Sequence, residues 1–170
     1  NNEKQYYMSR KENVRVEKGN LLIEARQEKV ENKEFKSIEN KDWRFNREFS
    51  EYTSASITTK NLAEWQYGKI EVRAKLPKGR GAWSAIWMLG ANWDEVGWAK
   101  CGEIDIMENI GREPSIVHGT VHGPGYSGEH GITAQFSLAN NAVFADDFHI
   151  YSIEWTPEKI DFMVDGEIYN

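Results

Sequence analysis

Three acidic side chains lie close together in the sequence, at Glu103, Asp105 and Glu108, and apolar residues separate them. This alternation predicts a β-strand, on which side chains two positions apart share a face. Glu103 and Asp105 therefore point the same way, whereas Glu108 would point to the opposite face of a regular strand. A β-bulge at Ile106 and Met107 would bring Glu108 round to the other two acids and leave one of the bulge pair facing the core.

A row of three carboxyl groups is unfavourable, because like charges repel and burial raises the pKa of at least one group. Retaining hydrolysis of a glycosidic bond uses such a pair of acids about 5–5.5 Å apart, one as nucleophile and one as acid and then base. Glu103 and Glu108 would have backbones ~16 Å apart on a regular strand, and the bulge and their long side chains shorten this path. A solvated polar face and a calcium site are alternatives. The spacing alone does not decide among the three.

Alternation with a period of two dominates the rest of the chain, for example in residues 69–76. Residues 159–165 alternate similarly and end in Asp165-Gly166, which predicts a hairpin turn. The charge-rich stretch 24–48 is expected to be solvated surface. Many short strands predict an antiparallel sandwich or barrel. The other expected strands are residues 20–26, 54–60, 82–89, 103–108, 116–122 and 149–155.

The composition limits the classes of protein. The length of 170 residues suits one domain. A net charge of −6 argues against nucleic acid as a partner, since nucleic-acid binding favours a basic surface. No apolar run approaches the ~20 residues that span a membrane, so a membrane is not an expected partner. Seven Trp, seven Tyr and seven Phe predict either a large aromatic core or a groove that stacks sugar rings.

Residues 102–108, Gly-Glu-Ile-Asp-Ile-Met-Glu, resemble the active-site motif of glycoside hydrolase family 16, in the bulged form typical of laminarinases, the endo-1,3-β-glucanases. The resemblance implies an all-β fold, a concanavalin A-like β-jelly-roll sandwich of two curved antiparallel sheets with the glucan in a cleft. It implies that Glu103 is the nucleophile, Asp105 its assisting acid and Glu108 the general acid and base, with no cofactor for catalysis. Similar blocks follow the family's order at residues 52–55, 67–77, 81–89, 120–124 and 149–155.

The function that the resemblance implies is endo-acting hydrolysis of β-1,3-glucan, with retention of the anomeric configuration by double displacement. The substrate would be a β-glucan polysaccharide or oligosaccharide, such as laminarin or a mixed-linkage β-1,3-1,4-glucan, and the protein would be secreted or extracellular. One alternative is a non-catalytic β-glucan-binding module on the same fold, which usually lacks the acid pair. Another is a family enzyme that acts on agarose, carrageenan or xyloglucan.

Three tryptophans are expected to bind the substrate by stacking on the apolar face of a sugar. Trp98 is similar to a cleft tryptophan of the family, although Ala99 stands where the family usually has proline. A position in the core is the alternative for Trp98. Trp83 and Trp87 share one face of their predicted strand, and the resemblance points that face at the substrate.

Three further residues are candidates for substrate binding. His122 matches a Val-His-Gly block of the family and is expected to hydrogen-bond near Glu108 or to the sugar, with a structural histidine as the alternative. His118 shares its face, but ~13 Å of strand separates the two rings, which excludes a shared zinc ion. Asn2 and Glu3 resemble a family segment that reaches the sugar at the non-reducing side of the cleft, with a frayed terminus as the alternative.

Residues 1–170 are expected to form a single glycoside hydrolase catalytic domain that is incomplete at both ends. Family members usually have an opening strand before the first residue of this chain, and a cleft strand and a closing strand after the last. A segment or a complementary chain would then complete the fold, because missing strands expose sheet edges. The family also implies a structural calcium ion on the convex side, for which the sequence assigns no ligands.

Overall fold

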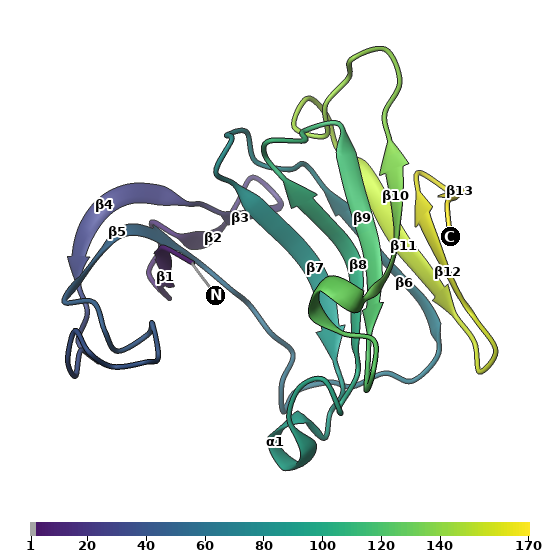
Figure 1. Cartoon of the computed structure of the whole chain (residues 1–170). Coiled ribbons are helices and arrows are strands. Elements are labelled where there is room, and N and C mark those ends of the chain that lie inside the picture. Colours follow the sequence, from purple (N-terminus) through teal and green to yellow (C-terminus); the bar gives the residue numbers. More distant parts are fainter. Residues whose placement is uncertain (1–2) are drawn as a thin grey trace. The chain divides into compact units, whose positions relative to one another are not determined.

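The computed structural model describes residues 3–170 (Figure 1). The chain divides into two compact units, residues 1–59 and 60–170; that they form the single predicted domain stays a prediction. Among the described residues, helix is limited to α1 (Trp93–Val96) and the 3-10 turn η1 (Gly128–His130). No helix in residues 3–170 has the length and apolar character that crossing a membrane requires.

The first unit consists of two small sheets. In one sheet the central strand β5 pairs in parallel with β1 and antiparallel with β4. In the other sheet β2 and β3 form an antiparallel hairpin. The strands are β1 (Gln5–Tyr7), β2 (Val14–Glu17), β3 (Asn20–Ile23), β4 (Arg26–Glu31) and β5 (Phe49–Ser54).

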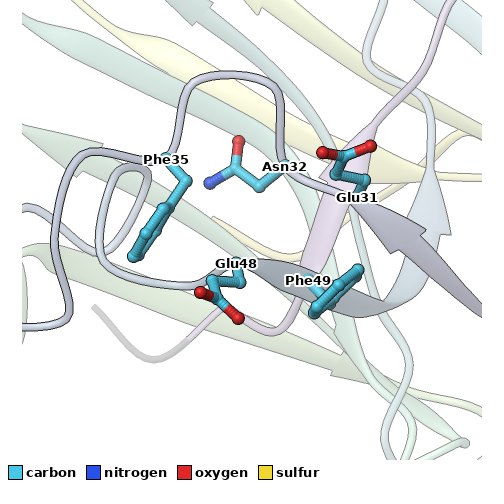
Figure 2. A pocket seen from close by; sticks show the side chains of 5 residues that line it. All are labelled: Glu31, Asn32, Phe35, Glu48 and Phe49. Atoms are coloured by element: carbon cyan, nitrogen blue, oxygen red, sulfur yellow. The ribbon is translucent and has the colours of Figure 1, made fainter.

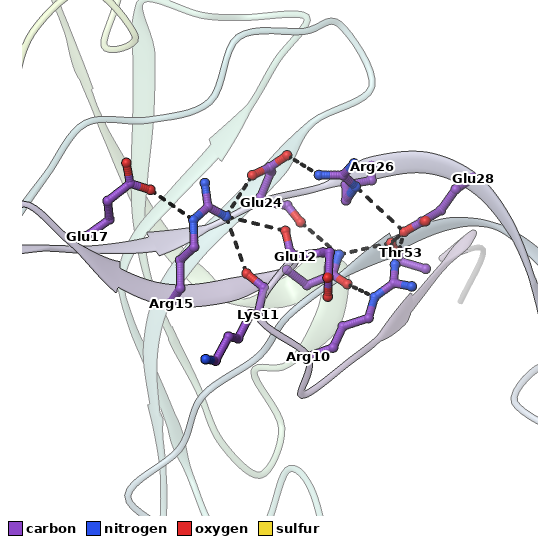
Figure 3. Close-up of polar contacts among 10 residues, drawn as sticks. Arg10, Lys11, Glu12, Arg15, Glu17, Glu24, Arg26, Glu28 and Thr53 are labelled. Atoms are coloured by element: carbon purple, nitrogen blue, oxygen red, sulfur yellow. Dashed lines mark hydrogen bonds and ion pairs between the residues drawn. The ribbon is translucent and has the colours of Figure 1, made fainter.

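Buried polar side chains hold the first unit together. Asn13 and Thr53 are both fully buried, and Asn13 Nδ2 donates hydrogen bonds to Thr53 Oγ1 at 2.9 Å and to Glu24 O at 3.0 Å. Arg10 and Glu28 form an ion pair, and both also contact the Thr53 hydroxyl. Partly exposed ion pairs contribute little singly, whereas the Asn13–Thr53 hydrogen bond is a fully buried polar link between the segment before β2 and strand β5. Figure 3 shows the ion pairs that continue from this point through Arg26, Glu24, Arg15 and Glu17.

The second unit is a sandwich of two four-stranded antiparallel sheets (Figure 1). One sheet has the order β10-β9-β8-β7, and the other has the order β13-β12-β11-β6. The strands of the first sheet are β7 (Trp83–Leu89), β8 (Glu103–Ile110), β9 (Ile116–His122) and β10 (Ile132–Ser137). Those of the second are β6 (Gly68–Ala74), β11 (His149–Trp155), β12 (Ile160–Val164) and β13 (Glu167–Ile168).

Apolar side chains from both sheets form the core between them. Because side chains alternate along each strand, the opposite face of each sheet is free to carry other residues. On the sheet of β7 to β10, that opposite face carries the acid row. The buried core residues are Leu76, Ile106, Met107, Val117, Phe144, Tyr151, Ile153, Phe162 and Val164.

The predicted antiparallel sandwich is confirmed, and most predicted strands lie within two residues of the observed ones. The prediction of a strand at residues 54–60 was wrong, because the nearest strand, β5, runs from Phe49 and ends at Ser54. Its buried residues are the polar Ser50 and Thr53, so its sequence lacks the apolar alternation that predicts a strand.

Two further differences concern the charged N-terminal part. The strand predicted at residues 20–26 is split into β3, which ends at Ile23 and pairs with β2, and β4, which begins at Arg26 and pairs with β5. Residues 26–31, expected to be solvated surface, form β4, with Glu28 and Val30 half-buried. The predicted hairpin turn is confirmed at Asp165 and Gly166, whose φ angles of 51° and 84° suit a type I′ turn.

The same turn contains a carboxylate that is held in its charged form. His149 Nδ1 lies 2.7 Å from Asp165 Oδ2, and Ile150 N–H donates to Asp165 Oδ1 at 2.8 Å. Partial burial opposes ionisation, but the hydrogen bonds from Ile150 and His149 outweigh it and lower the pKa of Asp165 below its usual value.

We predict that Asp165→Asn lowers the free energy of unfolding at pH 7 by at most about 1 kcal/mol, because the carboxylate is half exposed. Asparagine tolerates the left-handed backbone here, so the change isolates the charge. A lowered folded-state pKa gives stability that is present above the unfolded-state pKa and lost as the pH falls through the folded-state value. Urea unfolding should therefore show the two proteins converging in acid; a difference that persists undiminished at low pH would contradict the prediction.

Candidate active site

The strand of the acid row, β8, has an irregular register. Against β7 the pairing passes from Met107–Ile86 directly to Asp105–Trp87, which skips Ile106. Ile106 and Met107 are 2% and 1% exposed, and both belong to the core. The bulge predicted at these two residues is therefore confirmed, but the expectation that one of them alone faces the core was wrong. Because two successive side chains turn inward, the next residue emerges on the outer face.

The bulge brings the three acids to the same face of the sheet. Between Asp105 and Glu108, strand β8 advances three residues while β9 advances two. The partners on β9 are alternate residues and so share a face. The pairs are Glu103 with His122, Asp105 with Thr120, and Glu108 with His118.

Asp105 is nearly enclosed, with 4% of its surface exposed. Burial, the charges of Glu103 and Glu108, and a hydrogen bond with Glu103 together raise the pKa of Asp105 to about 8, and burial is the largest of these causes. Asp105 is therefore protonated at neutral pH and donates its hydrogen bond to Glu103. The proton reduces the repulsion in the row, since at most two of the three carboxyl groups are then charged.

Each glutamate accepts a hydrogen bond from an indole. Trp98 Nε1 donates to Glu103 Oε2, and Trp83 Nε1 donates to Glu108 Oε1 at 3.0 Å. Trp98 is 51% exposed, which excludes the alternative of a core position. Trp87, 49% exposed, lies on the same face of β7 as Trp83. All three predicted tryptophans are thus solvent-accessible, and two of them contact the acids directly.

His122 lies beside Asp105. Its Nε2 is 3.2 Å from Asp105 Oδ2, and across the strands it is paired with Glu103. The expectation that His122 hydrogen-bonds near Glu108 was wrong, because Glu108 is at the other end of the row and is paired with His118. His118 itself approaches Glu113 at 3.7 Å. The alternative, a hydrogen bond from His122 to the sugar, stays a prediction.

Sequence reasoning missed Thr120, which stands opposite Asp105 and is 4% exposed. Its Oγ1 lies 3.0 Å from Thr133 Oγ1 on β10. The available signal was its position on a predicted strand, two residues before His122. The pairing of that strand with β8, which places Thr120 opposite Asp105, is known only from the fold.

Comparison with known proteins identifies the family of the chain. The family model described as glycosyl hydrolases family 16 matches residues 1–170. The chain belongs to this family. The predicted all-β jelly-roll fold of family 16 is confirmed by its likeness to solved structures. The laminarinase catalytic domain from Thermotoga maritima is 48% identical with a TM-score of 0.87, and the endo-β-1,3-glucanase from Pyrococcus furiosus is 44% identical with a TM-score of 0.88.

The similarity extends over this entire chain but over part of each relative. A Rhodothermus marinus protein named beta-glucanase is 44% identical over 99% of this chain and 54% of its own length. The two structures are matched by 100% of this chain, which covers 62% of the T. maritima chain and 60% of the P. furiosus chain. The family 16 chain thus spans between half and two thirds of the length of these relatives.

The two N-terminal candidates belong to the first unit. Asn2 lies outside the described residues. The backbone carbonyl of Glu3 accepts a hydrogen bond from Arg47 Nη1 at 2.7 Å, and its carboxylate accepts one from Gln5 Nε2 at 3.3 Å. A sugar contact for Asn2 or Glu3 stays a prediction.

Metal ligation was one of the two alternative explanations of the acid row. In residues 3–170, no group of three or more His, Cys, Asp or Glu side chains is placed to hold a metal ion. The structural calcium ion that the resemblance implies on the convex side stays a prediction.

A separate hollow of about 230 Å³ lies in the first unit. Figure 2 shows the side chains around it, which include two carboxylates and two phenyl rings. It contains none of the residues that the sequence predicts to bind sugar. Its lining residues are Glu31, Asn32, Phe35, Glu48 and Phe49.

We predict that Asp105→Asn stabilises the family 16 chain. An aspartic acid whose folded-state pKa is raised to about 8 makes wild-type stability fall as the pH rises from about 4 to about 8. Asparagine cannot ionise, so the gain in unfolding free energy should grow over this range, reach the order of 2 kcal/mol or more, and level off above it.

Urea unfolding at several pH values measures this difference. The exposed Asp94, changed to Asn, is the matched control and should shift stability by less than about 0.5 kcal/mol. A gap between wild type and Asp105→Asn that does not widen with pH would show that Asp105 is ionised in the folded protein.

Proposed function

We propose that this chain carries the catalytic site of an enzyme that cleaves β-1,3-glucan internally with retention of the anomeric configuration. The observation that carries the proposal is the bulged row, in which Glu103 and Glu108 each accept an indole hydrogen bond and Asp105 lies between them. The substrate class is supported by the names of the similar proteins, a beta-glucanase, a laminarinase and an endo-β-1,3-glucanase.

In the first step, the Glu103 carboxylate attacks C1 of the sugar while the bond from C1 to the glycosidic oxygen breaks. Glu108, as a carboxylic acid, transfers its proton to that oxygen, and the leaving glucan departs as an alcohol. The products are a glycosyl ester on Glu103 and a carboxylate on Glu108. Because Trp83 Nε1 binds Oε1 of Glu108, the other oxygen, Oε2, is the one that carries the proton.

In the second step, the Glu108 carboxylate removes a proton from water, whose oxygen attacks C1 as the ester bond to Glu103 breaks. Glu103 returns to a carboxylate and Glu108 to a carboxylic acid. Two successive inversions at C1 give a product with the original configuration.

Asp105 and Trp98 stabilise the negative charge of Glu103 whenever it is a free carboxylate, before the first step and after the second. Each donates a hydrogen bond to Glu103, and such charge-assisted bonds are stronger than neutral ones. They favour the free carboxylate and so help the ester bond to break in the second step.

The exposed tryptophans supply the platform for the glucan. Trp83, Trp87 and Trp98 are between 49% and 65% exposed, and an indole face suits the C–H groups of a pyranose ring. We also propose that the enzyme acts outside the cell, since a glucan polysaccharide is too large and too polar to cross a membrane. A glucan-binding module would have no need of a nucleophile and a proton donor, so the acid row favours the enzyme.

The first test is a product assay with the full-length protein on laminarin, lichenan and agarose. We expect wild type to release oligosaccharides from laminarin, first as the β-anomer. Glu103→Ser should abolish release and keep oligosaccharide binding, because it removes the nucleophile and leaves the tryptophans. The exposed Glu154→Ser on β11 should retain wild-type activity. Hydrolysis of agarose in place of laminarin would contradict the substrate class, and an active Glu103→Ser would contradict the nucleophile.

The second test separates the role of Glu108. We predict that Glu108→Gln loses at least about 100-fold in rate on laminarin and much less on aryl glucosides with good leaving groups, which need no proton. Azide should restore turnover on the aryl substrate by attacking the glycosyl ester without a general base. An equal loss on both substrates, with no effect of azide, would exclude the acid and base role.

A further inference from the structure

The ring of His122 lies in a mostly enclosed space at one end of the acid row, between Asp105, Trp98 and Gly131, which we call its seat. Its side chain is 12% exposed, and its Nε2 lies 3.2 Å from Asp105 Oδ2. The Trp98 ring lies at a centroid distance of 6.0 Å. The other ring nitrogen, Nδ1, is buried without a hydrogen-bond partner among residues 3–170.

Gly131 forms the opposite wall of this seat. Strand β10 begins at Ile132, which pairs with Val121 on β9, so Gly131 stands one step further along, across from His122. A Cβ atom on Gly131 would lie 2.5 Å from His122 Cε1 and 2.6 Å from His122 Nδ1. It would also lie 2.9 Å from Thr120 Cγ2. Contacts this short are repulsive, so the ring occupies space that any other residue at 131 would fill.

The surroundings of the two ring nitrogens select one tautomer. A buried N–H without an acceptor is rare and unfavourable by about 1–3 kcal/mol, whereas a bare lone pair is tolerated more readily. Nδ1 therefore carries the lone pair and Nε2 the hydrogen, which Asp105 Oδ2 can accept. The hydrogen bonds then run in one direction, from His122 to Asp105 and from Asp105 to Glu103.

We propose that Gly131 and His122 are positioning residues for Asp105: the missing side chain of Gly131 seats the His122 ring so that its Nε2–H orients the Asp105 carboxyl toward Glu103. The inference rests on the proposed function, in which Glu103 is the nucleophile. Neither residue needs to touch the sugar, so their effect is on the rate of the chemical steps.

Gly131→Ala is a clean test, because Gly131 has φ −57° and ψ 148°, a conformation that alanine adopts freely. The added methyl should displace the His122 ring and lower kcat on laminarin roughly 10- to 100-fold with KM changed less than about twofold. The control is Gly81→Ala, where a Cβ would meet no atom within 4 Å. A raised KM at unchanged kcat, or equal losses in both variants, would overturn the inference.

A double-mutant cycle distinguishes positioning through His122 from general damage. His122→Gln keeps an amide donor for Asp105 on a flexible chain that can avoid the new methyl, and it should retain more activity than His122→Leu. In the His122→Gln background, Gly131→Ala should cost less than about threefold in kcat. If the methyl group costs as much without the ring as with it, the effect does not pass through His122.

A nitrogen NMR spectrum of the wild-type histidine rings tests the seat without activity. The His122 signals are identified by their loss in His122→Gln, and we expect the Nε2–H tautomer. The Nδ1–H tautomer would overturn the inference even in an active enzyme. A wild type that leaves laminarin uncut would instead refute the proposed function, whichever tautomer is found.

Discussion

One extra residue in β8 is the constraint on which the site depends. Without it, Glu108 would point into the sandwich. Ile106 and Met107 could not then both pack against the facing sheet. Burial of an apolar side chain of this size is worth about 1.5–3 kcal/mol, so packing two neighbours inward holds the bulge in place. A slip of one residue would exchange the faces of the whole strand. The geometry of the acids is therefore fixed by hydrophobic packing on the far side of the sheet.

The row is tolerated because the protein supplies partners for each acid. Asp105 keeps a proton, while Trp98 and Trp83 each donate to one glutamate. These donors come from different parts of the chain, the loop before β8 and the neighbouring strand β7. Such a site lowers stability relative to a neutral row, which is the usual relation between a catalytic arrangement and the fold that carries it. His122, which lies against Gly131, supplies a further partner for Asp105 from β9, the neighbouring strand on the other side of β8.

The two units are stabilised by different means. The second unit has an apolar core between two four-stranded sheets. The first unit has sheets of three and two strands, too small to enclose a comparable core. Among its described residues, the polar side chains of Asn13, Ser50 and Thr53 are fully buried. A buried polar network of this kind is specific in geometry, because each member loses a hydrogen bond if another moves.

The sequence by itself determined the strand-rich architecture and the family, because side-chain alternation and motif residues are local properties. It also predicted the bulge at Ile106 and Met107, once the spacing of the acids was combined with the resemblance to family 16. The sequence-based prediction failed at β5, whose buried residues are polar, and at β4, whose many charged residues did not indicate a strand. Tertiary structure alone decided that both bulge residues face inward, that His122 serves Asp105 and not Glu108, and that Thr120 and Gly131 border the row. The physical reason is that strand pairing joins residues distant in sequence, and no local pattern encodes the register between them.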